Sequence, residues 1–179
     1  MKALLSLIAF VSFFVASASP ARSAELAAGD DAPDFSLVGS DGKTYSLADF
    51  KDKQAIVVAW FPKAFTGGCT KECKSLRASG KELRQFDVAY FTASCDTPEV
   101  NKDFAKSLEL DYPILSDPTK EVAKAYGVVT PEREAPFRWT FYIGKDGKIL
   151  DIDKEVKTES HGKDVAAKLE KLGVAKKNK

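Results

Sequence analysis

The sequence predicts an α/β fold with a mixed central sheet flanked by helices. Two apolar runs, AIVVAWF (55–61) and FDVAYFTAS (86–94), are typical of strands buried on both faces. Each run precedes a stretch with helical features. Two more strand-like segments, RWTFYIG (138–144) and KILDIDK (148–154), lie near the end of the chain and indicate a hairpin. Alternating strands and helices followed by a hairpin predict this architecture.

The first elements follow from local patterns. DFSLVG (34–39) and KTYSL (43–47) flank an Asp-Gly turn and predict a short hairpin. The first buried strand comes next. A helix is then expected to begin at Gly68 or Cys69 and to end near Arg84.

Three further helices are expected in the second half of the chain. After the second buried strand, Thr97 is suited to the N-cap and Pro98 to the first helical position, which predicts a helix over 97–109. A short helix over 119–126 comes before the strand pair. A last helix over 162–172 closes the fold.

Composition and charge limit the possible functions. The 179 residues include 27 basic and 26 acidic side chains, for a net charge of +1, so nothing indicates a nucleic-acid partner. The chain has no internal repeat and no long linker. We therefore expect one domain over residues 27–174.

The N-terminal segment has the layout of a secretory signal peptide over residues 1–18. Lys2 precedes an apolar run over 3–15, and Ala16-Ser17-Ala18 is the best small-x-small cleavage site, with cleavage expected within 18–24. The apolar run is too short to span a bilayer comfortably. We expect a periplasmic or otherwise secreted protein, with no stable membrane association after cleavage.

The stretch FPKAFTGGCTKEC (61–73) carries Cys69 and Cys73 at the predicted helix start. A cysteine in a first helical turn faces unpaired backbone N–H groups and the positive end of the helix dipole, which favour the nucleophilic thiolate. Residues four apart on a helix have Cβ atoms about 5–6 Å apart, whereas a disulfide needs about 3.5–4.5 Å. A structural disulfide would require the first turn to unwind, so a redox-active Cys69 is favoured.

Pro62, Thr66 and Cys69 spell the motif PxxxTxxC, and their stretch resembles the active site of the peroxiredoxins, in the peroxiredoxin Q (bacterioferritin-comigratory) branch. The resemblance also covers segments 29–53, 94–128 and 138–149. It implies a thioredoxin-like fold. It also implies a thiol-dependent peroxidase for hydrogen peroxide or alkyl hydroperoxides, with no cofactor and no metal.

The resemblance also implies roles for individual residues. Cys69 is the peroxidatic cysteine, whose thiolate attacks the peroxide and becomes a sulfenic acid. Pro62 shields the sulfur from water, and Thr66 holds the peroxide oxygens. Arg138 donates to both thiolate and peroxide, and Glu72 helps to orient it. Fixed donors aimed at the developing negative charge agree with general catalytic principles.

The resolving cysteine departs from the family pattern. The branch often places it five residues after the peroxidatic one, where this chain has Lys74, while Cys73 comes at four. We expect Cys73 to resolve Cys69. Cys95 ends the second buried strand and is better explained as a small buried residue. An external thiol that resolves Cys69 is the remaining alternative. We expect the reductant to be a thioredoxin-like or other thiol. The protein is expected to be a monomer or a homodimer.

The sequence also shares features with proteins of other functions. The CxxxC spacing of Cys69 and Cys73 also resembles the Sco-type copper chaperones. Their metal-binding histidine lies before the strand that here begins near Arg138. His161, the one histidine, comes after the following strand, where a solvated loop or helix-start residue is expected. A thioredoxin-type reductase would need a CxxC motif, which is absent. A binding module on the same fold would not require the Pro, Thr, Cys and Arg set, so the presence of the complete set argues against that function.

Overall fold

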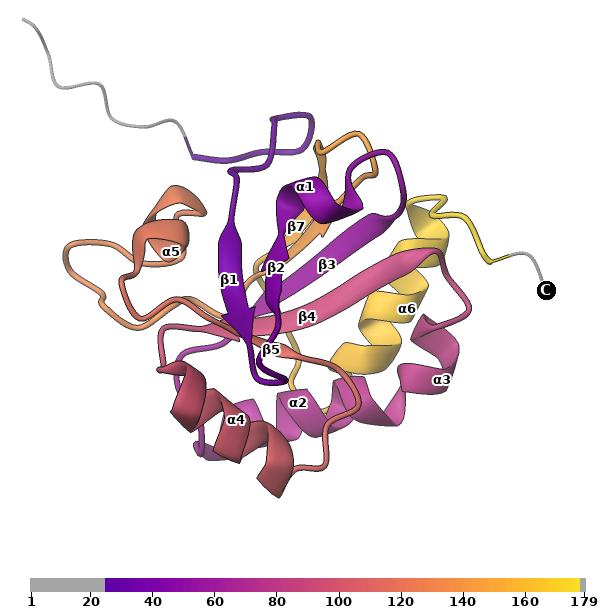
Figure 1. The fold of residues 1–179 in the computed structure, drawn as a ribbon. Helices are drawn as coiled ribbons and strands as arrows, with labels where there is room; N and C mark the ends of the chain where they lie inside the picture. Colours follow the sequence, from indigo (N-terminus) through magenta and orange to yellow (C-terminus); the bar gives the residue numbers. More distant parts are fainter. Residues whose placement is uncertain (1–24, 178–179) are drawn as a thin grey trace, which may run out of the picture.

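A seven-stranded mixed sheet lies at the centre of the fold, in the order β2-β1-β5-β4-β3-β6-β7 (Figure 1). The computed structural model describes residues 25–177. The strands are β1 (Ser36–Gly39), β2 (Thr44–Ser46), β3 (Ala55–Trp60), β4 (Val88–Ser94), β5 (Ile114–Ser116), β6 (Thr140–Ile143) and β7 (Ile149–Asp153). The helices are α1 (Leu47–Phe50), α2 (Gly67–Ala78), α3 (Gly80–Leu83), α4 (Pro98–Ser107), α5 (Glu121–Ala125) and α6 (His161–Lys171). The predicted α/β class is confirmed. The expected signal segment, 1–18, lies outside the described residues.

The two continuous apolar runs form the centre of the sheet. β3 and β4 pair in parallel, with Ala55 opposite Val88, and all six residues of β3 are buried. β4 also pairs in parallel with β5, whereas β6 is antiparallel to β3. The carboxyl ends of β3 and β4 therefore meet at one edge of the sheet, where the chain leaves toward α2 and α4.

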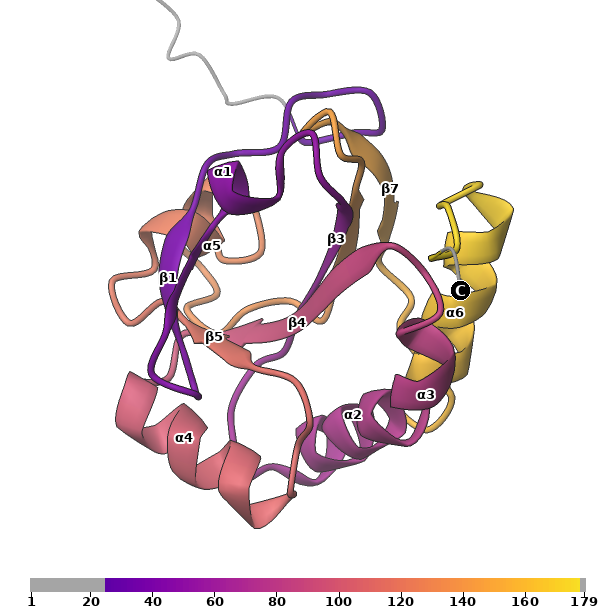
Figure 2. The same ribbon diagram turned by 45° about the vertical axis from the view of Figure 1, so that its right-hand side comes forward.

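Helices cover both faces of this sheet (Figure 2). One face packs against α1 and α5 through a core that includes Phe50, Phe91 and Ala123. The other face packs against α2, α3, α4 and α6. Since successive side chains of a strand point to opposite faces, each residue at the end of β3 or β4 is assigned to one of these two layers.

Several element boundaries differ from the predicted ones. The helix expected to run to Arg84 is two helices, because the chain turns at Ser79 between α2 and α3. Arg138 does not open a strand, since β6 begins at Thr140. β5 and α1 were not expected. β5 has three residues and α1 has four, which are too few for a hydrophobic pattern to be recognised. α1 is a single turn in which the Asp49 carboxylate accepts hydrogen bonds from Ser46.

The start of α6 is fixed against the middle of α2. The Gly162 N–H donates to Ser75 Oγ at 3.0 Å, and Ser75 Oγ donates to the Glu159 carbonyl at 3.1 Å. A Cβ atom on Gly162 would lie 2.3 Å from the Ser75 carbonyl oxygen, so only glycine permits this approach. The contact places His161 beside α2, on the side that carries Glu72.

Candidate active site

Cys69 occupies the first turn of α2, and its side chain is only 1% exposed. Thr66 is the N-cap residue, with extended backbone dihedrals (φ −95°, ψ 154°), but its side chain makes no capping hydrogen bond. Its hydroxyl instead donates to the Lys63 carbonyl at 2.9 Å. The N–H groups of the first turn, beside the Cys69 sulfur, thus remain available to a small ligand.

The loop between β3 and α2 is fixed to the end of β4. The Ala64 N–H donates to Asp96 Oδ2 at 2.8 Å, and the same carboxylate oxygen accepts from Ser94 Oγ at 3.0 Å. Pro62 is half-buried in this loop, and Phe65 has a positive φ of 60°. The polar tie stabilises a turn that a bulky side chain disfavours, so the entry to α2 is held in place.

Arg138 joins Cys69 to Glu72. Its Nη2 atom lies 3.4 Å from Cys69 Sγ, and its Nη1 atom donates to Glu72 Oε2. Glu72 is completely buried, one turn after the N-terminus of α2. A Cβ atom on Gly68 would lie 3.3 Å from Arg138 Nη2, so the glycine leaves room for the guanidinium at the helix start. The structure thus brings together three residues that the sequence analysis singled out.

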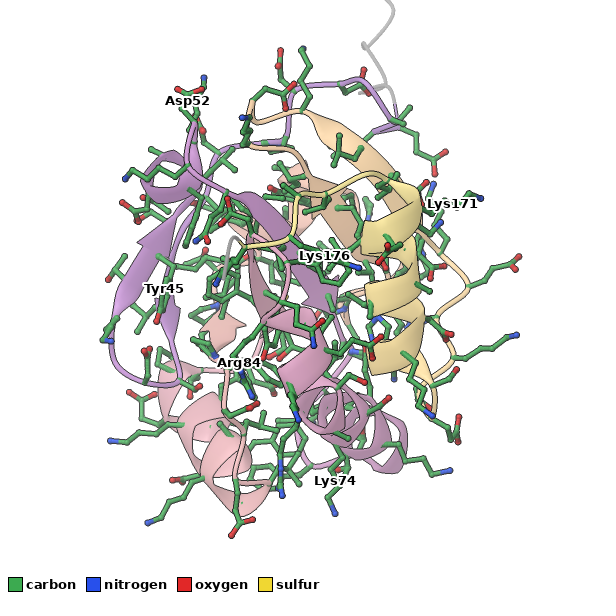
Figure 3. All side chains as sticks on the ribbon, turned by 90° about the vertical axis from the view of Figure 1, so that its right-hand side faces the viewer. Tyr45, Asp52, Lys74, Arg84, Lys171 and Lys176 are labelled. Atoms are coloured by element: carbon green, nitrogen blue, oxygen red, sulfur yellow. The ribbon has the colours of Figure 1, made fainter. Side chains whose placement is uncertain are left out.

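Cys73 faces the protein core. Its side chain is 0% exposed and packs in a cluster with Phe104 and Ile114. Burial raises the pKa of the Cys73 thiol to about 12. The Tyr112 hydroxyl donates to the Cys73 carbonyl at 3.0 Å and so ties this turn of α2 to the segment before β5. Lys74, at the position where the family branch often has its resolving cysteine, projects from α2 away from the protein body (Figure 3).

Cys95 lies on the other face of the sheet. It continues the alternation of Phe91 and Ala93 and packs, half-buried, against the core beneath α1 and α5. Burial raises its pKa to about 12, and the nearby Asp117 carboxylate acts in the same direction. The cysteines Cys69, Cys73 and Cys95 are all free thiols. Cys69 and Cys95 thus follow neighbouring strand ends but belong to different layers.

His161 was not recognised as a site residue from the sequence. It begins a helix, which is one of the two positions expected from the sequence. Its side chain is buried rather than solvated, however, with 1% exposure. Its Nδ1 atom lies 3.1 Å from Glu72 Oε1, and its Nε2 atom lies 2.9 Å from Thr140 Oγ1. A signal was present, because His161, Val165 and Leu169 recur every four residues and share the buried face of α6.

The buried environment keeps His161 neutral. Loss of hydration lowers the pKa of the imidazole to about 4, and the positive charge of Arg138 acts in the same direction. Asp153 and Asp164 oppose this shift but do not overcome it. A neutral imidazole carries one N–H donor and one acceptor nitrogen.

The lowered pKa of His161 predicts a loss of stability in mild acid. As the pH falls from 6.5 toward about 4, the unfolded chain binds a proton on this histidine and the folded chain does not. The free energy of unfolding therefore decreases across this window, by up to about 3 kcal/mol. Denaturant titrations at neutral pH and at the acidic end measure the decrease. His161→Asn removes the titrating group, so an equally large decrease in that variant would contradict the assignment.

Residues 25–177 contain no group of three or more His, Cys, Asp and Glu side chains arranged to hold a metal ion. His161 instead lies behind Glu72, with Nδ1 close to the Glu72 carboxylate and Nε2 within hydrogen-bond distance of Thr140. The Sco-type copper alternative therefore finds no support. Within the same residues, no helix has both the length and the apolar character needed to cross a membrane.

Comparisons with known proteins agree with this geometry. Residues 28–152 match the AhpC/TSA family model. Peroxiredoxin Bcp of Escherichia coli strain K12 is 36% identical over 142 residues, which cover 76% of this chain and 90% of that protein. The chloroplastic peroxiredoxin Q of Gentiana triflora is 32% identical over 140 residues, covering 77% of this chain and 64% of that protein.

A solved structure extends the match to three dimensions. The crystal structure of peroxidoxin BcpB from Mycobacterium tuberculosis superposes with a TM-score of 0.74 at 31% identity. The alignment covers 82% of this chain and 97% of that one, so the thioredoxin-like peroxiredoxin fold is shared along almost the whole relative. The chain therefore belongs to the AhpC/TSA family and is a thiol-dependent peroxidase of the peroxiredoxin type.

Proposed function

We propose that this protein reduces peroxides through Cys69. The observation that carries the proposal is the contact of 3.4 Å between Arg138 Nη2 and Cys69 Sγ. It lies at the N-terminus of α2, which no N-cap side chain occupies. The thiolate attacks one peroxide oxygen, the O–O bond breaks, and the sulfur becomes a sulfenic acid. The other oxygen takes a proton and leaves as water, or as an alcohol when the substrate is an alkyl hydroperoxide.

Arg138 and the helix start supply the stabilisation that this step needs. Negative charge moves from sulfur to the leaving oxygen, and a guanidinium fixed by Glu72 offers donors to both ends of that path. The free N–H groups of the first turn of α2 act in the same direction. Because these donors are already oriented, little reorganisation is required during the reaction.

Thr66 and Pro62 complete the pocket in this proposal. The Thr66 hydroxyl hydrogen is used on the Lys63 carbonyl, so the oxygen lone pairs remain to accept a hydrogen bond from the peroxide O–H. Pro62 offers no N–H to compete for the sulfur or the substrate. Its half-buried ring limits access of water to Cys69.

We further propose that Cys73 resolves the sulfenic acid. Its sulfur attacks Cys69 Sγ, the S–O bond breaks, and the oxygen leaves as water while a disulfide forms. A thioredoxin-like or other dithiol then restores both thiols. Cys95 is less suitable because it lies in the opposite layer of the sheet.

The resolution step requires the start of α2 to unwind. Backbone hydrogen bonds of one turn cost about 0.5–1.5 kcal/mol each. The structure adds terms that the sequence did not reveal, since both cysteines are buried and Tyr112 holds the Cys73 carbonyl. Opening this turn therefore costs more free energy than the loss of its backbone hydrogen bonds alone. Cys73 becomes reactive only after it leaves the core.

The identity of the resolving sulfur is testable with two serine variants. With one equivalent of peroxide, we expect Cys95→Ser to form the Cys69–Cys73 disulfide as the wild type does. Cys73→Ser should instead accumulate sulfenic acid on Cys69. Peptide mapping after trapping and alkylation distinguishes these products. A Cys69–Cys95 linkage in the wild type would refute the local-unwinding mechanism, and an unresolved sulfenic acid there would indicate an external resolver.

We also propose that the protein acts outside the cytoplasm. Support comes from the charged start, the apolar run over 3–15 and the small residues of the N-terminal segment. The cysteine count is compatible with an oxidising compartment, because two of the three thiols would cycle through a disulfide that a dedicated donor reduces. A monomer or homodimer suffices, since the residues assigned to the site come from one chain.

A further inference from the structure

A buried polar chain lies directly behind the active site. Glu72, Thr140 and His161 each have an exposure of 0–1%. Glu72 Oε2 is occupied by Arg138. Within residues 25–177, neither Glu72 Oε1 nor His161 Nδ1 makes a hydrogen bond of good geometry, yet these two atoms lie only 3.1 Å apart. A buried polar atom without a partner costs free energy, so this contact is the one that can satisfy both groups.

The positions of the acceptors define the tautomer of His161. A carboxylate oxygen only accepts hydrogen bonds, so the nitrogen that faces Glu72 must carry the proton. Nε2 then presents a lone pair, and the Thr140 hydroxyl, 2.9 Å away, donates to it. The resulting chain of donors runs from Thr140 to His161 to Glu72, and the same carboxylate receives Arg138.

We propose that His161 is a positioning residue for peroxide reduction: its Nδ1–H holds the Glu72 carboxylate in the orientation that directs Arg138 onto the Cys69 sulfur. The inference rests on the proposed roles of Cys69 and Arg138. His161 touches neither the substrate nor the sulfur. It acts through Glu72, whose carboxylate has one oxygen for His161 and the other for Arg138.

The energetic reason lies in the burial of Glu72. A buried carboxylate with one unpaired oxygen rotates or shifts until that oxygen finds a donor. Arg138 already donates to the other oxygen of the same carboxylate, so a rotation of Glu72 would draw the guanidinium away from Cys69 Sγ. His161 prevents this by satisfying Oε1. The fixed start of α6 supplies the rigidity, because Gly162 is locked onto Ser75.

Two variants separate the two ring nitrogens. The amide N–H of His161→Asn can take the place of Nδ1–H and still donate to Glu72, whereas His161→Gln places its amide near Nε2 and loses that donor. For His161→Gln we expect the second-order rate with hydrogen peroxide to fall about 10- to 100-fold, as for small misplacements of a catalytic group. His161→Asn should stay within about threefold of the wild type.

A second readout excludes a merely structural effect. The rate of Cys69 alkylation is followed against pH in a Cys73→Ser, Cys95→Ser background, where Cys69 is the only thiol. The pH of half-maximal alkylation should rise in His161→Gln and stay near the parent value in His161→Asn. The inference would be overturned if His161→Gln and His161→Asn behaved alike. That includes the case in which both match the wild type and the case in which both react more slowly with an unchanged pH midpoint of alkylation.

Thr140→Val provides the decisive variant if neither histidine variant folds. It keeps the shape of the side chain but removes the donor to Nε2, so the ring loses one of its two anchors. A slower peroxide reaction with a raised pH midpoint supports the inference, and wild-type values for both overturn it. Failure of the proposed function looks different, because the wild type itself would then not oxidise Cys69.

Discussion

Cys69→Ser is expected to abolish peroxide consumption. A serine hydroxyl has almost no anionic form at neutral pH and cannot accept an oxygen atom as sulfur does, so it cannot replace the Cys69 thiolate. Turnover is followed with hydrogen peroxide and a dithiol reductant. Cys95→Ser is the matched control and should keep its activity, because Cys95 lies in the opposite layer of the sheet.

Undiminished turnover in Cys69→Ser would remove the basis of the proposed mechanism. Loss of turnover in Cys95→Ser, with the fold intact by circular dichroism, would also count against it. That result would assign a chemical role to a sulfur that packs half-buried beneath α5.

Arg138→Lys is expected to lower the second-order rate with peroxide by about 10²- to 10³-fold, the usual cost of losing one fixed donor to a developing charge. Arg138 reaches Glu72 through Nη1 and Cys69 through Nη2 at the same time. A lysine ammonium is a single point charge on a flexible stem and cannot hold both contacts in one plane. Stopped-flow measurement with the reduced protein gives the rate.

Arg133→Lys is the matched control for this substitution. Arg133 is exposed, and its guanidinium lies 4.6 Å from the centre of the Phe137 ring, so the same change there should leave the rate within about twofold. A wild-type rate in Arg138→Lys would show that the guanidinium near Cys69 has no part in the chemistry. An equal loss in both variants would show that the effect is not specific to the guanidinium beside Cys69.

The elements that the sequence predicts well are those whose local residue pattern directly reflects their burial in the fold. β3 is buried on both faces, and its continuous apolar run indicated this directly. α4 begins as expected, with Thr97 Oγ1 accepting from the Val100 N–H and Pro98 at the first position. β5 escaped prediction because three residues carry no readable period, and its place in the sheet depends on β4.

The residues of the active site also differ in whether local sequence predicts them. The helix start explains Cys69 from local sequence, while Arg138 was placed by resemblance to a family, since nothing local distinguishes it from a solvated arginine. His161 was missed because its burial arises from the packing of α6 on α2, which Gly162 and Ser75 determine. The burial of Cys73 depends likewise on α4 and β5, which cover that side of α2.

The most direct test of the central claim is a single-turnover reaction of the fully reduced protein with hydrogen peroxide, followed by stopped flow, intact mass and peptide mapping. We expect one equivalent of peroxide to be consumed, Cys69 to be the first sulfur oxidised, and the product to be two hydrogens lighter, with Cys69 and Cys73 joined. Absence of peroxide consumption, or oxidation of another sulfur while Cys69 stays a free thiol, would contradict the account.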